Sequence, residues 1–191
     1  MTQARPLRAD ARRNREKLLA AATEAFAEEG EDMALEAIAA RAGVGIGTLY
    51  RHFPHRDALV EAAYRHEVEG LCAAAPTLLA ERAPDAALHE WMARFAHYVA
   101  TKRGMGDALT AAVAASGSPL FAQTRARITD AIGTLLAAGA EQGVLRGDVA
   151  ADDVFVAMGA VWHLPMTPGW QDQVRRLLAL LVDGLRHGAG G

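Results

Sequence analysis

The sequence predicts an all-α protein of about nine helices, with a three-helix domain at its N-terminal end and a larger helical domain after it. Hydrophobic residues make up 51% of the 191 residues, whereas aromatic residues make up only 6% and just seven residues are proline. Apolar side chains recur at intervals of three and four residues, as on one face of a helix, and no convincing strand pattern interrupts them. We therefore expect domains at residues 1–55 and 56–188 and a short tail at 189–191.

The first helix is expected to begin near Asp10, a good N-cap residue, and to end at Gly30. Six basic and two acidic side chains lie within the first seventeen residues, although the whole chain has a formal net charge of −3. This local excess suits contact with phosphates at one place, or it is simply a solvated tail. The basic residues are Arg5, Arg8, Arg12, Arg13, Arg15 and Lys17, and the apolar stripe that follows is Leu18, Leu19, Ala22, Ala25 and Phe26.

The stretch Leu35–Phe53 has the pattern of two short helices joined by a tight turn. Gly43 stands where the first of them must end, a position that often takes the left-handed conformation that glycine adopts at low cost. Ala39 is small where a steeply crossing second helix would come closest, and Val44 can fill the corner. The apolar faces are Leu35, Ile38, Ala39 and Ala42 on the first helix and Ile46, Leu49 and Phe53 on the second. This pattern predicts a helix-turn-helix, whose second helix enters the major groove of DNA.

A plain corner between two helices of a bundle is the alternative interpretation of this stretch. Such a corner needs no polar side chains on its second helix. Here the second helix offers four of them outward: Thr48, Tyr50, Arg51 and His52. We therefore prefer the DNA-binding interpretation.

Proline and glycine divide the rest of the chain into further helices. A long fourth helix is expected at about 56–80, because Pro54 ends the one before it, and a fifth follows Pro84. Its apolar face is Leu88, Trp91, Met92, Phe95, Tyr98 and Val99. Gly104 and Gly106 mark a bend before a short sixth helix.

The last three helices are predicted from caps and from apolar stripes. The first of them is expected to take Ser118 as N-cap and Pro119 as first residue, and to end near Gly143. The second begins at Asp152 and Asp153, whose charges favour a helix start, and carries Val154, Phe155, Met158, Val161 and Trp162. The third is expected at Trp170–Leu185.

Cysteine usage and hydropathy limit the classes of protein to be considered. The chain has one cysteine, Cys72, which excludes an intrachain disulfide and a zinc site with several cysteine ligands. No apolar run reaches the length of a membrane span, and the arginine-rich start is no secretory signal. We expect a cytoplasmic protein with no membrane partner.

The segment Gly43–Tyr64, GVGIGTLYRHFPHRDALVEAAY, resembles the DNA-binding segment of the TetR family of one-component transcriptional regulators. The resemblance extends from about residue 12 to residue 64, and its most specific part is Thr48–Phe53. Beyond about residue 70 it concerns architecture alone. It implies a homodimer that binds a palindromic operator, most often as a repressor, and is released by a small apolar effector. Ala34 and Gly45 depart from the family, which usually has hydroxyl residues at these helix starts.

The resemblance also assigns DNA-contact roles to matching positions. Hydroxyls of Thr48 and Tyr50, a ring N–H of His52 and the charge of Arg56 suit phosphate oxygens, contacts that carry little sequence information. Base reading then falls to the start of the second helix, where Gly47 permits close approach. For Tyr50 the alternative is packing against the first helix. The complete predicted set is Gly45, Ile46, Gly47, Thr48, Tyr50, Arg51, His52 and Arg56.

Two further sites are expected in the larger domain. An effector pocket is predicted at Trp91, Phe95, Tyr98, Met105, Phe121, Thr124, Met158 and Trp162, although aromatic residues at helical spacing are also what a plain core contains. A dimer interface built from the final two helices is predicted at Phe155, Val174, Leu177, Leu178, Leu181 and Leu185, and here too the alternative is that the stripes face their own core.

An enzyme is the competing class, and the sequence gives it little support. His89-Glu90 begins like a zinc-protease helix, but position 93 is alanine and the second histidine is missing. The glycines at 43, 45 and 47 lack the strand and the spacing of a dinucleotide loop. We expect no cofactor and no metal. An activator, or a helical interaction protein that has lost DNA binding, remains the alternative within the fold, and the sequence identifies neither effector nor operator.

Overall fold

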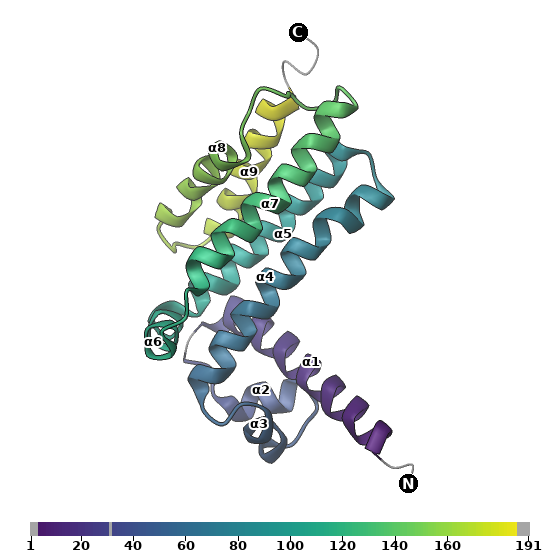
Figure 1. The fold of residues 1–191 in the computed structure, drawn as a ribbon. Coiled ribbons are helices and arrows are strands. Elements are labelled where there is room, and N and C mark those ends of the chain that lie inside the picture. The colour runs from purple at the N-terminus through teal and green to yellow at the C-terminus, as the bar shows by residue number, and fades with distance from the viewer. Residues whose placement is uncertain (1–3, 31, 187–191) are drawn as a thin grey trace. The chain divides into compact units, whose positions relative to one another are not determined.

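A computed structural model describes residues 4–30 and 32–186 of the chain, with the side chains from residue 9 onward. Within this part the chain forms nine α-helices and one 3-10 helix and contains no strand (Figure 1). The predicted all-α class and the number of helices are confirmed. The predicted tail at 189–191 and the side chains of Arg5 and Arg8 lie outside the described part. None of the described helices is both long and apolar enough to cross a membrane.

The helices group into two compact units. Unit 1 is Met1–Glu67 with Ala100–Ser118, and unit 2 is Val68–Val99 with Pro119–Gly191. The long helices α4 (Arg56–Glu81) and α5 (Pro84–Gly104) contribute residues to both units. The grouping places residues 56–67 of α4 in unit 1 with the N-terminal helices, whereas the expected domain boundary lies after residue 55.

Unit 1 is built around α1 (Ala4–Glu29), α2 (Leu35–Arg41) and α3 (Ile46–His52), each of which packs on the other two. The start of α4, the end of α5 and α6 (Gly106–Ser116) complete it. The buried residues contributed by α1 to α4 include Leu18, Leu19, Ala22, Phe26, Ile38, Leu49, Phe53, Leu59 and Val60. The residues of this list up to Phe53 belong to the apolar stripes that the spacing predicted.

Helix α1 begins at Ala4 rather than near Asp10. Pro6 does not stop it, because the first amides of a helix have no helical acceptor and the missing N–H costs nothing there. The helix thus starts six residues before the predicted N-cap residue.

The end of α5 lies against the end of α1 within unit 1. A Cβ atom added at Gly104 would overlap the carbonyl oxygen of Phe26, which belongs to the backbone of α1 and cannot move aside easily. Glycine is therefore required at position 104 by the close approach of two helices.

Unit 2 contains the remaining parts of α4 and α5 together with α7 (Leu120–Glu141), α8 (Ala151–Met158), the 3-10 helix η1 (Gly159–His163) and α9 (Trp170–Arg186). Helix α7 packs on α8, and α8 packs on α9 (Figure 1). The buried residues include Leu71, Leu78, Leu88, Trp91, Phe95, Ile128, Ile132, Leu135, Val154, Met158, Val174, Leu178 and Val182. As predicted, Asp152 and Asp153 lie in the first turn of α8.

Two predicted helix boundaries in the second half of the chain were wrong. Helix α7 takes Pro119 as its N-cap and Leu120 as its first residue, and no side chain caps it. The hydroxyl of Ser118 instead accepts a hydrogen bond from Arg65 at 3.0 Å, so a contact within unit 1 replaces the local cap. The helix expected to run through Trp162 is α-helical only to Met158, and Val161 and Trp162 lie in η1.

Candidate nucleic-acid interface

The turn between α2 and α3 fixes the direction of α3. Gly43 has a φ angle of +67°, in the left-handed region. Its N–H donates to the carbonyl oxygen of Ala40 at 3.0 Å, and the N–H of Val44 donates to that of Ala39 at 3.0 Å. Together these two bonds satisfy carbonyls that the end of α2 would leave unpaired. The predicted role of Gly43 as the residue that ends the helix is confirmed.

One buried side chain in α3 and another just after it hold the helix to the rest of unit 1. Leu49, at the centre of α3, is fully buried, and Phe53, its C-cap residue, is almost so. The guanidinium of Arg15 in α1 lies over the Phe53 ring, 5.3 Å from its centroid. Ala39 is also buried, as expected of the small residue at the crossing of α2 and α3.

The face of α3 opposite Leu49 is open to solvent. Successive residues turn by about 100°, so Gly47 lies roughly opposite Leu49 and Arg51 lies one turn further along the same face. Both are exposed, and Tyr50 beside them is 46% exposed. Tyr50 is therefore not buried within the subunit. Of the other predicted residues on α3 and its cap, Gly45 and Ile46 are exposed and Thr48 and His52 are half-buried.

Packing within the subunit does not require glycine at positions 45 and 47. A Cβ atom added at either position would meet nothing within 4 Å, and neither residue has a positive φ angle. Gly47 lies inside α3, where glycine nevertheless costs about 1 kcal/mol relative to alanine, whereas Gly45 is the N-cap residue, a position that glycine suits. The two glycines leave a strip of bare backbone on the outer side of α3, which suits a partner that approaches closely.

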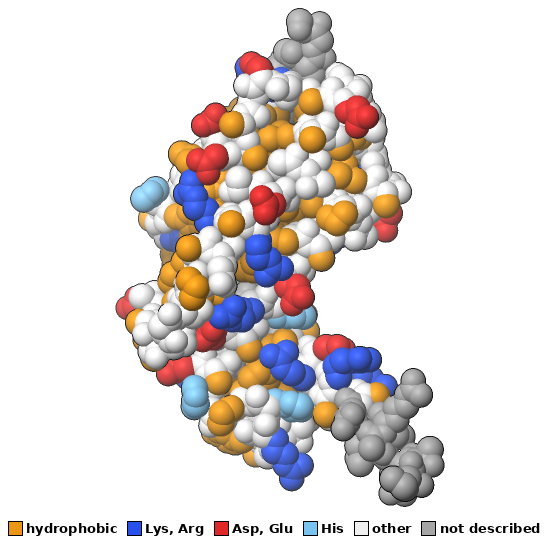
Figure 2. Space-filling model, in the orientation of Figure 1, with side chains coloured by type: hydrophobic (Ala, Val, Ile, Leu, Met, Phe, Trp, Pro, Cys, Tyr) orange, Lys and Arg blue, Asp and Glu red, His pale blue; other side chains and the backbone are white. Residues whose placement is uncertain are grey.

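The charges around this face are only partly neutralised. Arg41 at the end of α2 pairs with Glu28 and Glu29 of α1, each at 3.0 Å. By contrast, Arg51 and Lys17 are exposed, and neither forms an ion pair or hydrogen bond with any residue that the structure describes. Figure 2 shows basic and histidine side chains over the α2–α3 end of unit 1. Arg51 and Lys17 are therefore available to an anion, as is the exposed Arg15, which contacts an aromatic ring but pairs with no acidic side chain that the structure describes.

Arg56 has an internal partner that its predicted role as a phosphate contact did not include. It is half-buried, and its Nη1 donates to the carbonyl oxygen of Met33, in the loop before α2, at 2.7 Å. His55 caps the start of α4 by accepting the N–H of Ala58 at its Nδ1, at 3.2 Å. In this conformation Arg56 links α4 to the loop before α2, and its contact with phosphate stays a prediction.

Comparisons with known proteins agree with this geometry. Residues 18–63 match the family described as bacterial regulatory proteins, tetR family, and residues 83–187 match the family described as transcriptional regulator SbtR-like, C-terminal domain. The crystal structure of the TetR transcriptional regulator SCO0520 from Streptomyces coelicolor is 48% identical, with a TM-score of 0.82 over 90% of this chain and 98% of that one. The chain belongs to the TetR family.

Other TetR-type proteins resemble the chain over different extents. A TetR transcription regulatory protein from Mycobacterium vanbaalenii is 35% identical over 95% of this chain and 99% of its own, with a TM-score of 0.74. HTH-type transcriptional regulators from Staphylococcus aureus, among them that of strain USA300, are 43% identical over 54 residues. That match covers 28% of this chain and only 29% of the length of these curated relatives. The chain is thus a TetR-family transcriptional regulator.

The two departures from the usual TetR caps are present in the structure. Ala34 is the N-cap of α2 and Gly45 is the N-cap of α3, both in extended conformation, and neither provides a side-chain hydrogen bond. The short helices of this TetR-type helix-turn-helix therefore lack the stabilisation of about 0.5–2 kcal/mol that a polar cap contributes.

Four of the eight residues predicted to line an effector pocket form an aromatic column in unit 2, and the other four lie elsewhere. Trp91 stacks on Phe95 with ring centroids 5.9 Å apart, Phe95 contacts Tyr98 at 5.5 Å, and Tyr98 meets Trp162 edge-on at 6.0 Å. The indole N–H of Trp91 donates to the Leu71 carbonyl oxygen at 2.9 Å. Of the remaining predicted residues, Thr124 and Met158 are buried in unit 2, Phe121 is exposed, and Met105 is buried in unit 1. The pocket at these residues stays a prediction.

The residues predicted for the dimer interface fall on both sides of α9. Val174 and Leu178 are buried in the core of unit 2, which is the alternative that their spacing allowed. Leu177 and Leu181 lie on the outer side together with Leu180, which the prediction missed and which is 68% exposed. Phe155 is half-buried, with the Arg125 guanidinium 4.7 Å from its ring centroid. Leu185 is buried yet lines a groove of about 500 Å³ between α8 and α9, with Val149, Asp153, Ala157, Leu177, Leu180, Leu181 and Gly184.

Proposed function

We propose that this regulator is a repressor that binds a palindromic operator as a homodimer and leaves it when a small apolar effector binds. The observation that carries the DNA-binding part is the outer face of α3. Leu49 anchors the helix, while Gly47, Tyr50 and Arg51 face solvent. A short exposed helix held in this way by a tight glycine turn is the part that a helix-turn-helix protein inserts into the major groove.

The contacts can be assigned from the chemistry of the side chains. The Thr48 and Tyr50 hydroxyls and the His52 ring N–H hydrogen-bond to phosphate oxygens, and the unpaired Arg51 adds a positive charge. The bare backbone at Gly45 and Gly47 comes closest to the base edges. One helix of seven residues makes few such contacts, so tight binding needs two half-sites. Two recognition helices about 34–36 Å apart would read successive major grooves of a palindrome.

The second copy of the chain docks on the outer side of α8 and α9. Support comes from exposed apolar side chains on both helices: Val156 of α8 is 60% exposed, and Leu180 of α9, which lines the α8–α9 groove, is 68% exposed. Monomeric proteins rarely leave such a patch open to water. In a twofold dimer the same residues meet their own copies, which makes the two-helix face of one chain half of a four-helix bundle.

The effector part of the proposal rests on the aromatic column of unit 2 and on the family. A ligand that inserts between the body helices has to bind the conformation without DNA more tightly than the conformation with DNA. A coupling free energy of about 1–3 kcal/mol would then loosen DNA about 5- to 150-fold.

The experiment that tests DNA recognition compares Tyr50→Ala and Tyr50→Phe with the wild type. An operator is first selected from a random duplex pool, and the dissociation constant is then measured by mobility shift at fixed salt. Loss of about 0.5–1.5 kcal/mol for one hydrogen bond in each subunit predicts roughly 5- to 150-fold weaker binding for both variants, with thermal midpoints unchanged. Wild-type affinity in Tyr50→Ala would contradict the assignment, and wild-type affinity in Tyr50→Phe alone would assign the contact to the ring.

A further inference from the structure

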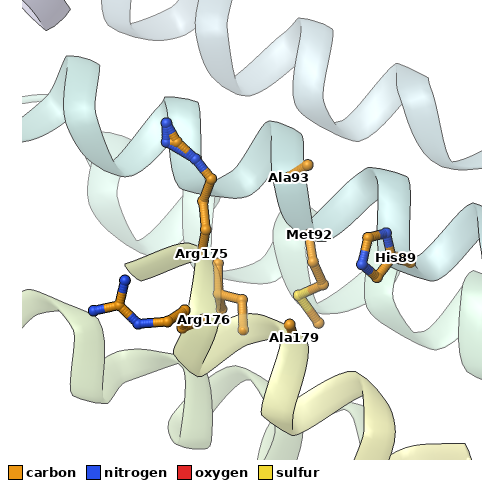
Figure 3. Close-up of a pocket in the computed structure, with 7 residues that line it drawn as sticks. His89, Met92, Ala93, Arg175, Arg176 and Ala179 are labelled. Carbon is orange, nitrogen blue, oxygen red and sulfur yellow. The ribbon is translucent and has the colours of Figure 1, made fainter. Parts of the chain in front are cut away.

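A small cavity in unit 2 lies between α5 and α9, apart from the aromatic column and from the groove beside α8. Its volume is about 280 Å³. Figure 3 shows the residues that line it: His89, Met92 and Ala93 come from α5, and Arg175, Arg176 and Ala179 come from α9.

The floor of this cavity is apolar and well fixed. Met92 and Leu178 form part of it, and both side chains are almost completely buried. Ala93 and Ala179 are the small residues of the lining, one on each helix, and their short side chains leave space between α5 and α9. A ligand in this space would place its carbon atoms against Met92 and Leu178, which binding pockets for small molecules commonly provide.

The polar groups of the lining are all nitrogen-bearing donors. Arg176 is exposed and has no ion-pair or hydrogen-bond partner among the described residues. Arg175 has one exposed partner, Asp172, at 3.3 Å. In Figure 3 the two guanidinium groups lie on one side of Met92 and the His89 ring lies on the other. No lining residue is acidic, and Arg175 is paired with Asp172, so the charge of Arg176 is the one at this apolar cavity that no described acidic side chain neutralises.

We propose that this cavity binds a small monocarboxylate with a compact apolar body. The carboxylate pairs with the guanidinium of Arg176, because the planar fork of arginine matches the two oxygens of a carboxylate. The apolar body rests on Met92 and Leu178. At about 30 Å³ for each water-sized group, the volume holds a ligand of roughly ten heavy atoms. A neutral molecule of the same size would form no ion pair with Arg176, and a dianion of this size would have too little apolar surface to cover Met92 and Leu178.

The test is direct binding of benzoate to the full chain, measured by calorimetry in the absence of DNA. The measurement does not depend on the proposed repressor function, so either can fail alone. Benzoate is expected to bind the wild type, and benzyl alcohol of similar size is expected to bind much more weakly. Higher ionic strength should weaken benzoate binding, because exposed charges are screened.

Three variants separate the two parts of the proposal. Arg176→Gln removes one charge at an exposed position and should weaken benzoate about five- to tenfold. Arg82→Gln is the matched control, since Arg82 is also exposed in unit 2 but does not line the cavity, and its affinity should equal that of the wild type. Ala93→Leu, also at an exposed position, fills the cavity and should abolish binding while the thermal midpoint stays close to that of the wild type.

Four results would overturn the proposal. The first is that benzoate binds no form of the protein, and the second is that benzyl alcohol binds as tightly as benzoate. The third is that Arg176→Gln and Arg82→Gln weaken benzoate binding by the same factor. The fourth is that Ala93→Leu binds benzoate as tightly as the wild type. Each of the four shows that the Arg176 side chain and the cavity do not form one carboxylate site.

Discussion

Gly47 gives the most discriminating test of the DNA-facing surface, because stability and function should respond to it in opposite directions. The free subunit leaves space for a methyl group at this position, with no atom within 4 Å of an added Cβ and no positive φ angle. Gly47→Ala should therefore stabilise the folded protein by about 0.5–1 kcal/mol, the usual difference between the two residues inside a helix. Urea unfolding of the free protein measures this gain.

Operator binding should instead become weaker in Gly47→Ala. Position 47 lies roughly opposite the buried Leu49, at the centre of the face that we place in the groove. A methyl group forced into a close-packed contact costs about 1–3 kcal/mol, and it would be present in both subunits, so we expect at least a tenfold loss of affinity. A mobility-shift titration of the selected operator at fixed salt measures this loss.

Gly70→Ala is the matched control for this experiment. Gly70 lies within α4, is exposed, and also has no atom within 4 Å of an added Cβ. It should show the same gain in stability and unchanged affinity for the operator. If Gly47→Ala bound the operator as tightly as Gly70→Ala, close approach of DNA to the α3 backbone would be refuted.

Three further predictions concern stability and assembly. Ala34→Ser should raise the free energy of unfolding by about 0.5–2 kcal/mol, because the N-cap of α2 already has the extended conformation that a capping serine needs. An unchanged or lower thermal midpoint would mean that the first N–H groups of α2 already have other hydrogen-bond acceptors. Gly104→Ala should lower the free energy of unfolding by about 1–3 kcal/mol, because its Cβ would overlap the Phe26 carbonyl oxygen, and a wild-type midpoint would show that α5 can shift. Leu180→Glu should convert the dimer into a monomer, as measured by sedimentation. Met166→Glu is the control and should remain a dimer, because Met166 is 58% exposed but lies outside the helices. A dimeric Leu180→Glu would place the interface elsewhere.

The helix-turn-helix could be predicted from the sequence because its constraints are local. Gly43 has to adopt a positive φ angle, and Leu49 has to face inward three residues after the start of α3. Such requirements restrict the residue type at fixed spacings, so a single sequence carries them. The apolar stripes of α1 and α9 are local in the same sense, and the structure confirms both helices.

Features that depend on distant parts of the chain could not be predicted in this way. Ser118 has the side chain of an N-cap, but it bonds to Arg65, which is far away in sequence. Arg56 likewise donates to the carbonyl oxygen of Met33, a residue in the loop before α2 that is also distant in sequence. The periodicity of α9 identified its apolar residues but could not assign Val174 to the subunit core and Leu180 to the outer side.

The cavity between α5 and α9 shows the same limit. The sequence predicts no role for Arg175 and Arg176, and His89-Glu90 matches only part of a zinc motif. What gives these residues a common role is their position around one apolar floor, and sequence spacing carries no information on which faces of α5 and α9 oppose each other.

Selection of DNA by the wild-type protein from a random duplex pool, followed by footprinting of the selected sequence, tests the central claim most directly. A dimer that inserts α3 of each chain should select an inverted repeat and protect two major-groove segments one helical turn apart, with protection lost in Tyr50→Ala. Selection of no sequence by a folded protein, or a footprint confined to one site without symmetry, would contradict this account.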